Sequence, residues 1–128
     1  MATLYGETIL EHFRHPRNYG TLPSPDISHE GFNPLCGDRI RMELKLDGRE
    51  RVEAARFKGD SCAISFAAAS ILTEIIQGLA LTEVEGLAEE ELMAALKAEI
   101  RPSRINCALL PLHVLHEGIA AYKLQRGI

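Results

Sequence analysis

The clearest pattern along the chain is a strict alternation of apolar and polar residues between positions 40 and 46. The apolar residues of this stretch are Ile40, Met42, Leu44 and Leu46, and the polar ones are Arg41, Glu43 and Lys45. A period of two predicts a strand with one buried face. Asp47 and Gly48 follow as a favoured two-residue turn, and residues 52–57 predict a second, antiparallel strand with a bulge near Ala54.

Apolar residues at helical spacing predict helices on both sides of this hairpin. A short amphipathic helix ends before Pro16, and residues 20–35, which are rich in glycine and proline, predict a long loop. This loop region, with Tyr19 and Phe32, is interpreted either as a mobile lid or partner contact, or as an ordered cover over one sheet edge. Residues 62–79 are apolar nearly all round, which is typical of a buried helix.

The last third of the chain predicts two more helices. Thr82 and Glu85 offer a capping box before a helix over residues 87–100, whose acidic first turn complements the helix dipole. A final amphipathic helix covers residues 105–122, and Pro111 is expected to kink its start or to lie in its first turn.

The order of these elements predicts an α+β fold in which helices pack on one face of a small antiparallel sheet built on the hairpin. About three strands are expected. With 128 residues, of which 46% are hydrophobic, the chain is expected to form a single domain over residues 1–128. Its N-terminal segment, about residues 1–20, is expected to be mobile.

Charge and targeting signals narrow the class of protein. The formal net charge of -4 provides no strong cationic field for a nucleic acid backbone, so DNA and RNA are not expected as partners. The N-terminus lacks the pattern of a signal peptide, and no apolar run reaches the roughly 18 residues of a membrane span. We therefore expect a cytoplasmic protein with no membrane partner.

Three cysteines are too few, and odd in number, for a disulfide scaffold, so they are interpreted as metal ligands, reactive thiols or core residues. If the hairpin turn is tight, Cys36 falls near the end of the second strand and close to Cys62. Cys36 and Asp38 are two apart in extended chain, so their side chains point the same way, with Gly37 as a permissive hinge.

Cys107 lies at another element boundary, just before the final helix. A helix N-terminus and the nearby bases Arg39, Lys58 and Arg104 favour the thiolate form of such cysteines. Three thiolates and one carboxylate are unfavourable in one place without a bound cation. Sulfur ligands select zinc, copper(I) or iron–sulfur units, and the harder carboxylate of Asp38 is then the weakest ligand.

Four segments also match a known family, in order and at fitting separations: LYGETILEHFRHPRNYG near the start, NPLCGD at 33–38, GDSCAIS at 59–65 and RINCALL at 104–110. The chain resembles the IscU, SufU and NifU-N-terminal group of iron–sulfur cluster assembly proteins, and the likeness runs from about Leu4 to Gln125. The resemblance implies a SufE/IscU-like fold and the following ligands of a transient [2Fe-2S] cluster, or of Zn²⁺ in its place: Cys36, Asp38, Cys62 and Cys107. Asp38 would keep the cluster transferable, with Gly37, Lys58 and Arg104 in supporting positions.

The resemblance further implies a scaffold or carrier protein rather than an enzyme. Such a protein accepts persulfide sulfur from a cysteine desulfurase and receives iron from an iron donor. It then passes the assembled cluster to apo iron–sulfur proteins or carrier proteins.

Two departures from the family pattern leave two interpretations, an IscU-like scaffold and a SufU-like sulfurtransferase. Asn106 stands where IscU has a histidine, and residues 100–104 replace its LPPVK-like chaperone-recognition motif. Arg104 resembles instead the zinc-dependent sulfur-transfer branch, SufU, but the separation of Cys62 and Cys107 leaves no space for the insertion typical of SufU. The scaffold is the main hypothesis, and a SufU-like zinc-dependent sulfurtransferase is the alternative.

Two other classes of function stay open at the level of sequence. An enzyme with a single cysteine nucleophile needs only one of the three thiols, and an interaction module needs none. The histidines are expected to be mostly solvent-facing or capping; they are His12, His15, His29, His113 and His116.

Overall fold

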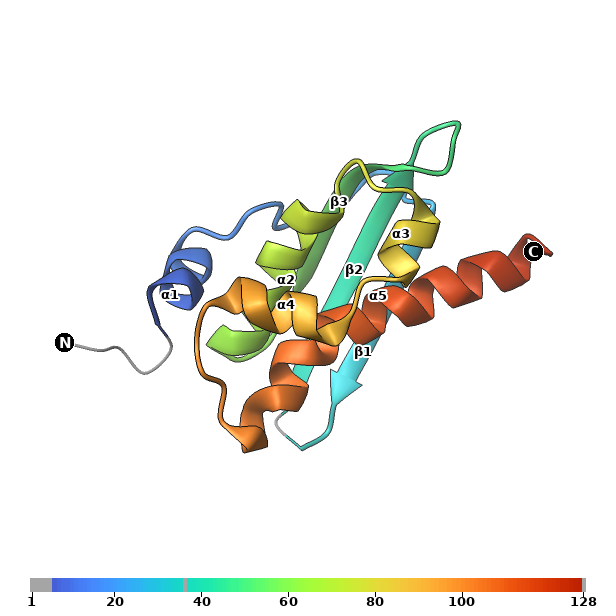
Figure 1. Ribbon diagram of the computed structural model, residues 1–128. Helices are drawn as coiled ribbons and strands as arrows, with labels where there is room; N and C mark the ends of the chain where they lie inside the picture. The colour runs from blue at the N-terminus through green and yellow to red at the C-terminus, as the bar shows by residue number, and fades with distance from the viewer. Residues whose placement is uncertain (1–5, 36, 128) are drawn as a thin grey trace.

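The computed structural model describes residues 6–35 and 37–127 and has the expected α+β architecture (Figure 1). The elements are α1 (Gly6–Arg14), β1 (Ile27–Asn33), β2 (Asp38–Leu46), β3 (Val52–Asp60), α2 (Ala63–Ile76), α3 (Leu81–Glu85), α4 (Glu89–Leu96), the 3₁₀ helix η1 (Pro102–Arg104) and α5 (Ile105–Gln125). The strands form a three-stranded antiparallel sheet in the order β1-β2-β3, which confirms the predicted small sheet.

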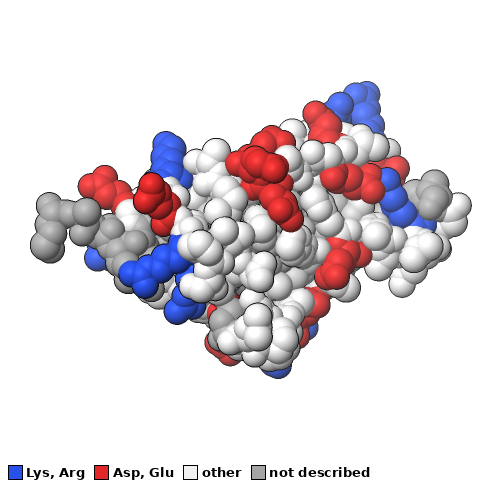
Figure 2. Space-filling model, turned by 60° about the horizontal axis from the view of Figure 1, so that its bottom comes forward, with Lys and Arg blue, Asp and Glu red and all other residues white. Residues whose placement is uncertain are grey.

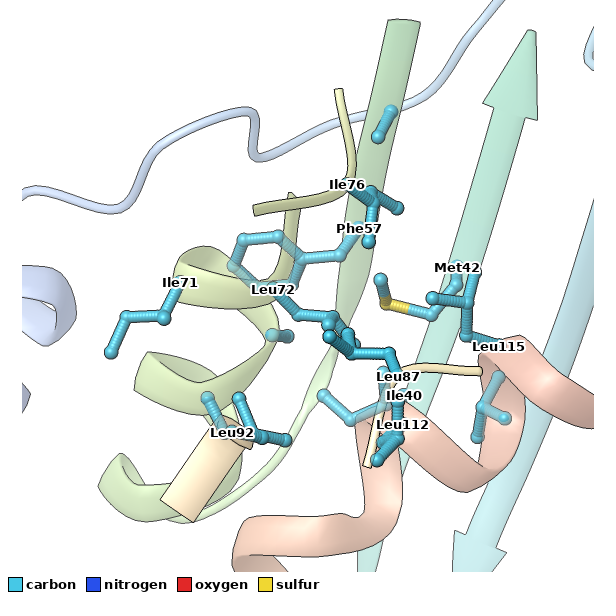
Figure 3. Packing of buried hydrophobic residues seen from close by; sticks show 14 of the residues in the cluster. Ile40, Met42, Phe57, Ile71, Leu72, Ile76, Leu87, Leu92, Leu112 and Leu115 are labelled. Carbon is cyan, nitrogen blue, oxygen red and sulfur yellow. The ribbon is translucent and has the colours of Figure 1, made fainter. Parts of the chain in front are cut away.

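Helices α2 and α5 pack on one face of this sheet, and α4 packs against both of them (Figure 1). The alternation in β2 has the predicted effect, because Ile40, Met42 and Leu44 are at most 1% exposed. These side chains join Leu72 of α2 and Leu115 of α5 in the apolar core (Figure 3). The arrangement brings the starts of β2, α2 and α5 to the same end of the sheet (Figure 1).

The predicted loop over residues 20–35 is wrong in its second half, which forms the edge strand β1. The reason is the packing of α5 on β1. A Cβ atom at Gly31 would lie 2.3 Å from Cγ2 of Val114, so a glycine inside this strand allows the helix to approach. In the sequence, the same glycine and its polar neighbours are typical of a loop. Residues 27–33 are therefore ordered, but as the edge strand itself and not as a cover over it.

The tight hairpin turn is also wrong. A two-residue turn would place Leu46 opposite Arg49, whereas Leu46 pairs with Val52. Asp47 organises a longer loop, because its Oδ1 accepts the backbone N–H groups of Arg49 at 2.8 Å and Arg51 at 3.0 Å. The predicted bulge is confirmed as a register shift between Lys45 and Leu46.

The corrected register moves Asp38 along the sheet. A tight turn would place Asp38 near Phe57, but the pairing of Arg39 with Asp60 puts Asp38 beyond the last residue of β3. Asp38 therefore lies where the chain leaves the sheet to begin α2, closer to Cys62 than the sequence predicts.

The predicted helix over residues 87–100 is α4, and it is shorter than expected. The capping box of Thr82 and Glu85 is wrong, because a separate helix, α3, includes both residues. Glu83 and Glu91 accept the backbone N–H groups of Ala80 and Ala88, at 2.9 and 3.1 Å, and so cap α3 and α4. The acidic first turn of α4 is as predicted.

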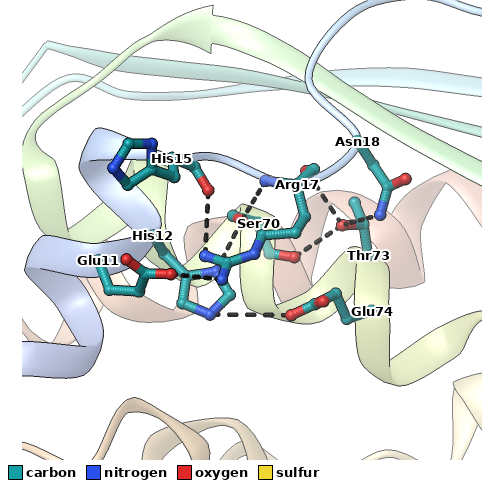
Figure 4. A network of polar contacts seen from close by, with 8 residues as sticks. All are labelled: Glu11, His12, His15, Arg17, Asn18, Ser70, Thr73 and Glu74. Carbon is teal, nitrogen blue, oxygen red and sulfur yellow. Dashed lines mark hydrogen bonds and ion pairs between the residues drawn. The ribbon is translucent and has the colours of Figure 1, made fainter.

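Helix α1 and the segment that follows it make polar contacts with α2 (Figure 4). Nδ1 of His12 lies 2.8 Å from Oγ of Ser70, which also accepts the backbone N–H of Arg17 at 2.9 Å. Asn18 donates to Oγ1 of Thr73 at 3.1 Å. His12 is 8% exposed, so the expectation of a solvent-facing histidine is wrong at this position. The mobility of residues 1–20 stays a prediction, and residues 1–5 lie outside the described part of the chain.

These contacts predict a pH dependence of folding stability. Burial lowers the pKa of His12, and the positive charge of Arg17 adds to this effect, while Glu74 and Glu11 oppose it. Below about pH 6.5 the unfolded chain therefore binds a proton more readily than the folded one. The free energy of unfolding should fall as the pH drops from about 7 through the lowered pKa of His12.

Urea unfolding at about pH 7.5 and about pH 5.5 measures this loss. In His12→Asn, which keeps a polar group near the position of Nδ1, the difference between the two pH values should shrink. The exposed His15→Asn serves as the control and should behave like the parent. An equal pH difference in the parent and in His12→Asn would contradict the assignment.

Within residues 6–35 and 37–127, none of the helices combines the length and apolar content that a membrane-spanning helix needs. The surface in Figure 2 mixes acidic, basic and uncharged side chains. On that face, the Lys and Arg side chains form small separate groups rather than one continuous cationic surface.

Candidate metal centre

Three of the predicted ligands come from the starts of three different elements. Asp38 begins β2, Cys62 is the residue before α2, and Cys107 lies in the first turn of α5. Gly59 helps to bring the chain together here. A Cβ atom at this position would lie 2.0 Å from the carbonyl oxygen of Arg39, and φ is +156°, so only glycine fits without strain.

The ligand atoms of Asp38, Cys62 and Cys107 all lie within 4.8 Å of one another. Oδ1 of Asp38 accepts the backbone N–H of Cys62 at 2.8 Å, while Oδ2 lies 3.5 Å from Sγ of Cys62. Asp38 and Cys107 are each 2% exposed, and Cys62 is partly exposed. The carboxylate is thus held by the N–H of Cys62, the residue before α2, and presents its second oxygen to the sulfur of that residue.

This spacing fits a shared metal atom. Metal–sulfur and metal–oxygen bonds of about 2.3 and 2.0 Å at a tetrahedral angle place sulfur and oxygen about 3.5 Å apart. The measured separation of Sγ of Cys62 and Oδ2 of Asp38 is 3.5 Å. Two sulfurs and one carboxylate are also a donor set that suits zinc or iron. The described residues therefore fit either a Zn²⁺ ion or one iron of a cluster.

Ser65 is part of the site, and the sequence analysis missed it. It lies in the first turn of α2, is fully buried, and places its Oγ 2.8 Å from Oδ2 of Asp38 and 2.6 Å from the carbonyl oxygen of Cys107. Oγ also lies 3.9 Å from Sγ of Cys62. The signal was present, because residues three apart on a helix share a face and Ser65 follows Cys62 by three.

Pro111 explains why the carbonyl of Cys107 needs a partner. In an α-helix this carbonyl would accept the N–H of the residue four positions later, which is Pro111 and has no N–H. The sequence predicted that Pro111 either kinks the start of the final helix or lies in its first turn. In the structure Pro111 lies inside α5, beyond the first turn. The hydroxyl of Ser65 takes the place of the missing donor.

The remaining predicted site residues, one ligand and the supporting residues, do not all lie beside the three described ligands. Cys36 lies outside the described residues. Gly37 has φ of +75°, a conformation that glycine adopts without strain. Lys58 alternates with the buried Phe57 on β3 and lies on the opposite face of the sheet, so the structure does not bring it to the three described ligands.

Arg104 lies beside the site. A hollow of about 430 Å³ opens next to Cys107 and is lined by Asn33, Leu35, Ser103, Arg104, Asn106 and Cys107. Leu35, at the rim, is 89% exposed. The buried Cys107 thus has an approach from the surface, past Arg104.

The histidines do not extend the ligand cluster. Among the described His, Cys, Asp and Glu residues, the group of Asp38, Cys62 and Cys107 is the one whose ligand atoms converge closely enough for a metal. His113 pairs instead with Glu89, on α4, at 2.9 Å.

Comparisons with known proteins identify relatives of this chain. Residues 4–127 match the family described as NifU-like N terminal domain. The zinc-dependent sulfurtransferase SufU of Bacillus subtilis is 36% identical, over 94% of this chain and 92% of SufU. The iron–sulfur cluster assembly scaffold protein IscU of Haemophilus influenzae is 31% identical, over 96% of this chain and 98% of IscU.

Solved structures share the fold. A putative iron–sulfur cluster assembly scaffold protein for the SUF system from Fervidobacterium islandicum superposes with a TM-score of 0.77 at 24% identity, over 90% of this chain and 96% of that one. The N-terminal part of a NifU-like protein from Brucella abortus gives 0.79 at 19% identity, over 95% and 96%. The family match over nearly the whole chain, together with the converging cysteines and aspartate, shows that this protein belongs to the NifU-like N-terminal domain family.

Proposed function

We propose that this chain is a scaffold that assembles a [2Fe-2S] cluster on Cys36, Asp38, Cys62 and Cys107 and passes it to apo-proteins. The observation that carries the proposal is the convergence of three donor groups from three separate elements within 4.8 Å. An inert interaction module has no need of such a convergence. The relative IscU, an iron–sulfur cluster assembly scaffold protein, supports the same role.

Sulfur would reach the site from a cysteine desulfurase. A thiolate of this chain attacks the outer sulfur of the desulfurase persulfide, so that a new S–S bond forms here and the desulfurase cysteine leaves as a thiolate. The hollow beside Cys107 provides a path for that approach, and the exposed Leu35 at its rim is a contact for the partner.

Cluster formation needs iron and electrons as well as sulfur. Each persulfide sulfur takes up two electrons to become sulfide. Two ferrous ions that become ferric supply half of the electrons for a [2Fe-2S] unit, so an electron donor must supply the other half. The proposed partners are therefore a desulfurase, an iron donor and a low-potential reductant, with apo iron–sulfur proteins or carriers as recipients.

Asp38 would make the cluster transferable. A carboxylate is a harder ligand than a thiolate and binds soft iron–sulfur units less strongly. The scaffold would therefore release its cargo at Asp38 first, because recipients that offer a thiolate replace the weakest ligand. This role fits a carrier rather than an enzyme that keeps its cofactor.

The alternative is a zinc-dependent sulfurtransferase that relays persulfide sulfur. One observation favours it: SufU, a zinc-dependent sulfurtransferase, is among the relatives at 36% identity. In that case the metal stays in place and sulfur alone moves.

One reconstitution separates the two. The chain is incubated without oxygen with a desulfurase, cysteine, ferrous iron and a thiol reductant, and its visible spectrum is recorded before apo-ferredoxin is added. The scaffold proposal expects a [2Fe-2S] chromophore that moves to the ferredoxin. Persulfide on the chain without any chromophore would contradict it and support the relay.

Replacing Asp38 by cysteine tests the release step. A fourth thiolate should hold the cluster more tightly, so transfer to apo-ferredoxin should slow by about tenfold or more. Asp60→Cys, which adds a thiol at an exposed position nearby, is the matched control and should transfer at the parent rate. Transfer from Asp38→Cys at the parent rate would show that Asp38 does not govern release.

A further inference from the structure

We propose that Ser65 is the positioning residue of this metal centre, whose hydroxyl sets the orientation of both Asp38 and the backbone of Cys107. The inference rests on the proposed function only in requiring that these residues bind a metal. No ligand role is assigned to Ser65 itself.

The hydroxyl of Ser65 contacts all three ligand residues that the structure describes. Its Oγ lies within 3.9 Å of a group from each of the three described ligand residues: Oδ2 of Asp38, the carbonyl of Cys107 and Sγ of Cys62. The side chain is fully buried, so water does not compete for these contacts.

The carboxylate of Asp38 is fixed from two sides. The N–H of Cys62 holds Oδ1, and the hydroxyl of Ser65 reaches Oδ2, the oxygen nearest to Sγ of Cys62. Ser65 therefore adds a restraint at Oδ2 to the one that the backbone N–H of Cys62 provides at Oδ1. Groups that orient metal ligands in this way typically contribute about 10- to 100-fold to metal affinity.

The hydroxyl also couples two ligands that are remote in sequence. Ser65 carries one proton, and the carboxylate of Asp38, ionised as a metal ligand must be, competes for it with the carbonyl of Cys107. Position 111, four residues after Cys107, is a proline without an N–H, and the hydroxyl of Ser65 lies 2.6 Å from that carbonyl. A shift of Asp38 toward a metal would leave the proton to Cys107, so the start of α5 is connected to the state of the carboxylate.

The test compares two buried hydroxyls on the same helix. Ser65→Ala should lower the zinc affinity of the chain by about 10- to 100-fold, measured by competition with a chromogenic chelator. Ser70→Ala removes an equally buried hydroxyl with two hydrogen bonds, but away from the site, and should leave the zinc affinity unchanged. Circular dichroism checks that each variant is folded.

Two further variants exclude a merely structural effect. Ser65→Thr keeps the hydroxyl and should retain the zinc affinity. In an Asp38→Ala background, Ser65→Ala should cost clearly less than in the parent, because one of its targets is gone. Zinc affinity within twofold of the parent for folded Ser65→Ala, a Thr variant as weak as Ala, or full additivity with Asp38→Ala would overturn the proposal.

The outcome is distinct from a failure of the proposed function. If Cys62→Ser binds zinc as the parent does, the metal centre itself is wrong. If Cys62→Ser loses zinc while Ser65→Ala keeps it, only the role of Ser65 is wrong.

Discussion

Replacing Cys62 by serine should reduce the metal content of the purified protein from about one zinc or one cluster per chain to less than about a tenth of that. A hydroxyl is a far weaker ligand than a thiolate for zinc and iron. The remaining donors are too few to close a tetrahedral site. The same loss is expected for Cys107→Ser and for Cys36→Ser, since the proposal needs all three sulfurs.

Elemental analysis and a visible spectrum of protein purified without oxygen measure this effect. His113→Ala is the control, because it removes a side chain that could bind a metal on α5 but lies outside the site, where it pairs with Glu89. It should retain the parent metal content. Parent-like metal content in any one of the three cysteine variants would contradict a shared site, and the loss of function in only one of them would favour a cysteine nucleophile.

Zinc should raise the melting temperature of the chain by about 10 to 20 °C. Zinc at about 1,000 times its dissociation constant adds about 4 kcal/mol to the free energy of unfolding. For a chain of this length, about 1 kcal/mol corresponds to roughly 3 to 5 °C. The gain is expected because the ligands join the starts of β2, α2 and α5, which in the described residues are otherwise connected only by packing and hydrogen bonds.

Scanning calorimetry of the chelator-treated and zinc-loaded protein gives the shift directly. Cys107→Ser, which separates α5 from the metal, should show little or none of it. Equal melting temperatures with and without zinc in the parent would mean that the metal does not connect these elements.

The sequence predicts the elements whose periodicity is set by simple burial. The strand β2 is an example, because Ile40, Met42 and Leu44 are buried in the apolar core, while Arg39 and Arg41 are exposed. Glu43 departs from the alternation, since it is buried and accepts the backbone N–H of Leu22. The buried helix α2 was predicted for the same reason, since ten of its residues are buried. Such patterns survive in the sequence because one physical requirement acts on every position of the element.

Prediction from the sequence is wrong where the conformation or burial of a residue depends on a contact with a residue far along the chain. Gly31 is typical of a loop until Val114 of α5 is packed against it. Asp47 differs because its contacts are local: the sequence places it in a two-residue turn, whereas its carboxylate accepts the backbone N–H groups of Arg49 and Arg51 in a longer loop. His12 is expected at the surface until Ser70 is found beside it.

The residues of the candidate site also fall into those that the sequence predicts and one, Ser65, that it does not. The convergence of Asp38, Cys62 and Cys107 could be predicted from their chemistry, and the register error did not separate them because all three remained at the same end of the sheet. Ser65 could be placed on the same helix face as Cys62 from its spacing, but the spacing does not predict its contacts with Asp38 and Cys107, which come from other elements. Its role depends on Pro111 freeing a carbonyl on another helix.

The central claim is that folding brings three cysteines and one aspartate around one metal. X-ray absorption at the zinc edge of the zinc-loaded protein measures that coordination shell most directly. The account predicts three sulfur ligands at about 2.3 Å and one oxygen at about 2.0 Å. A shell of nitrogen and oxygen alone, or one with a single sulfur, would contradict it.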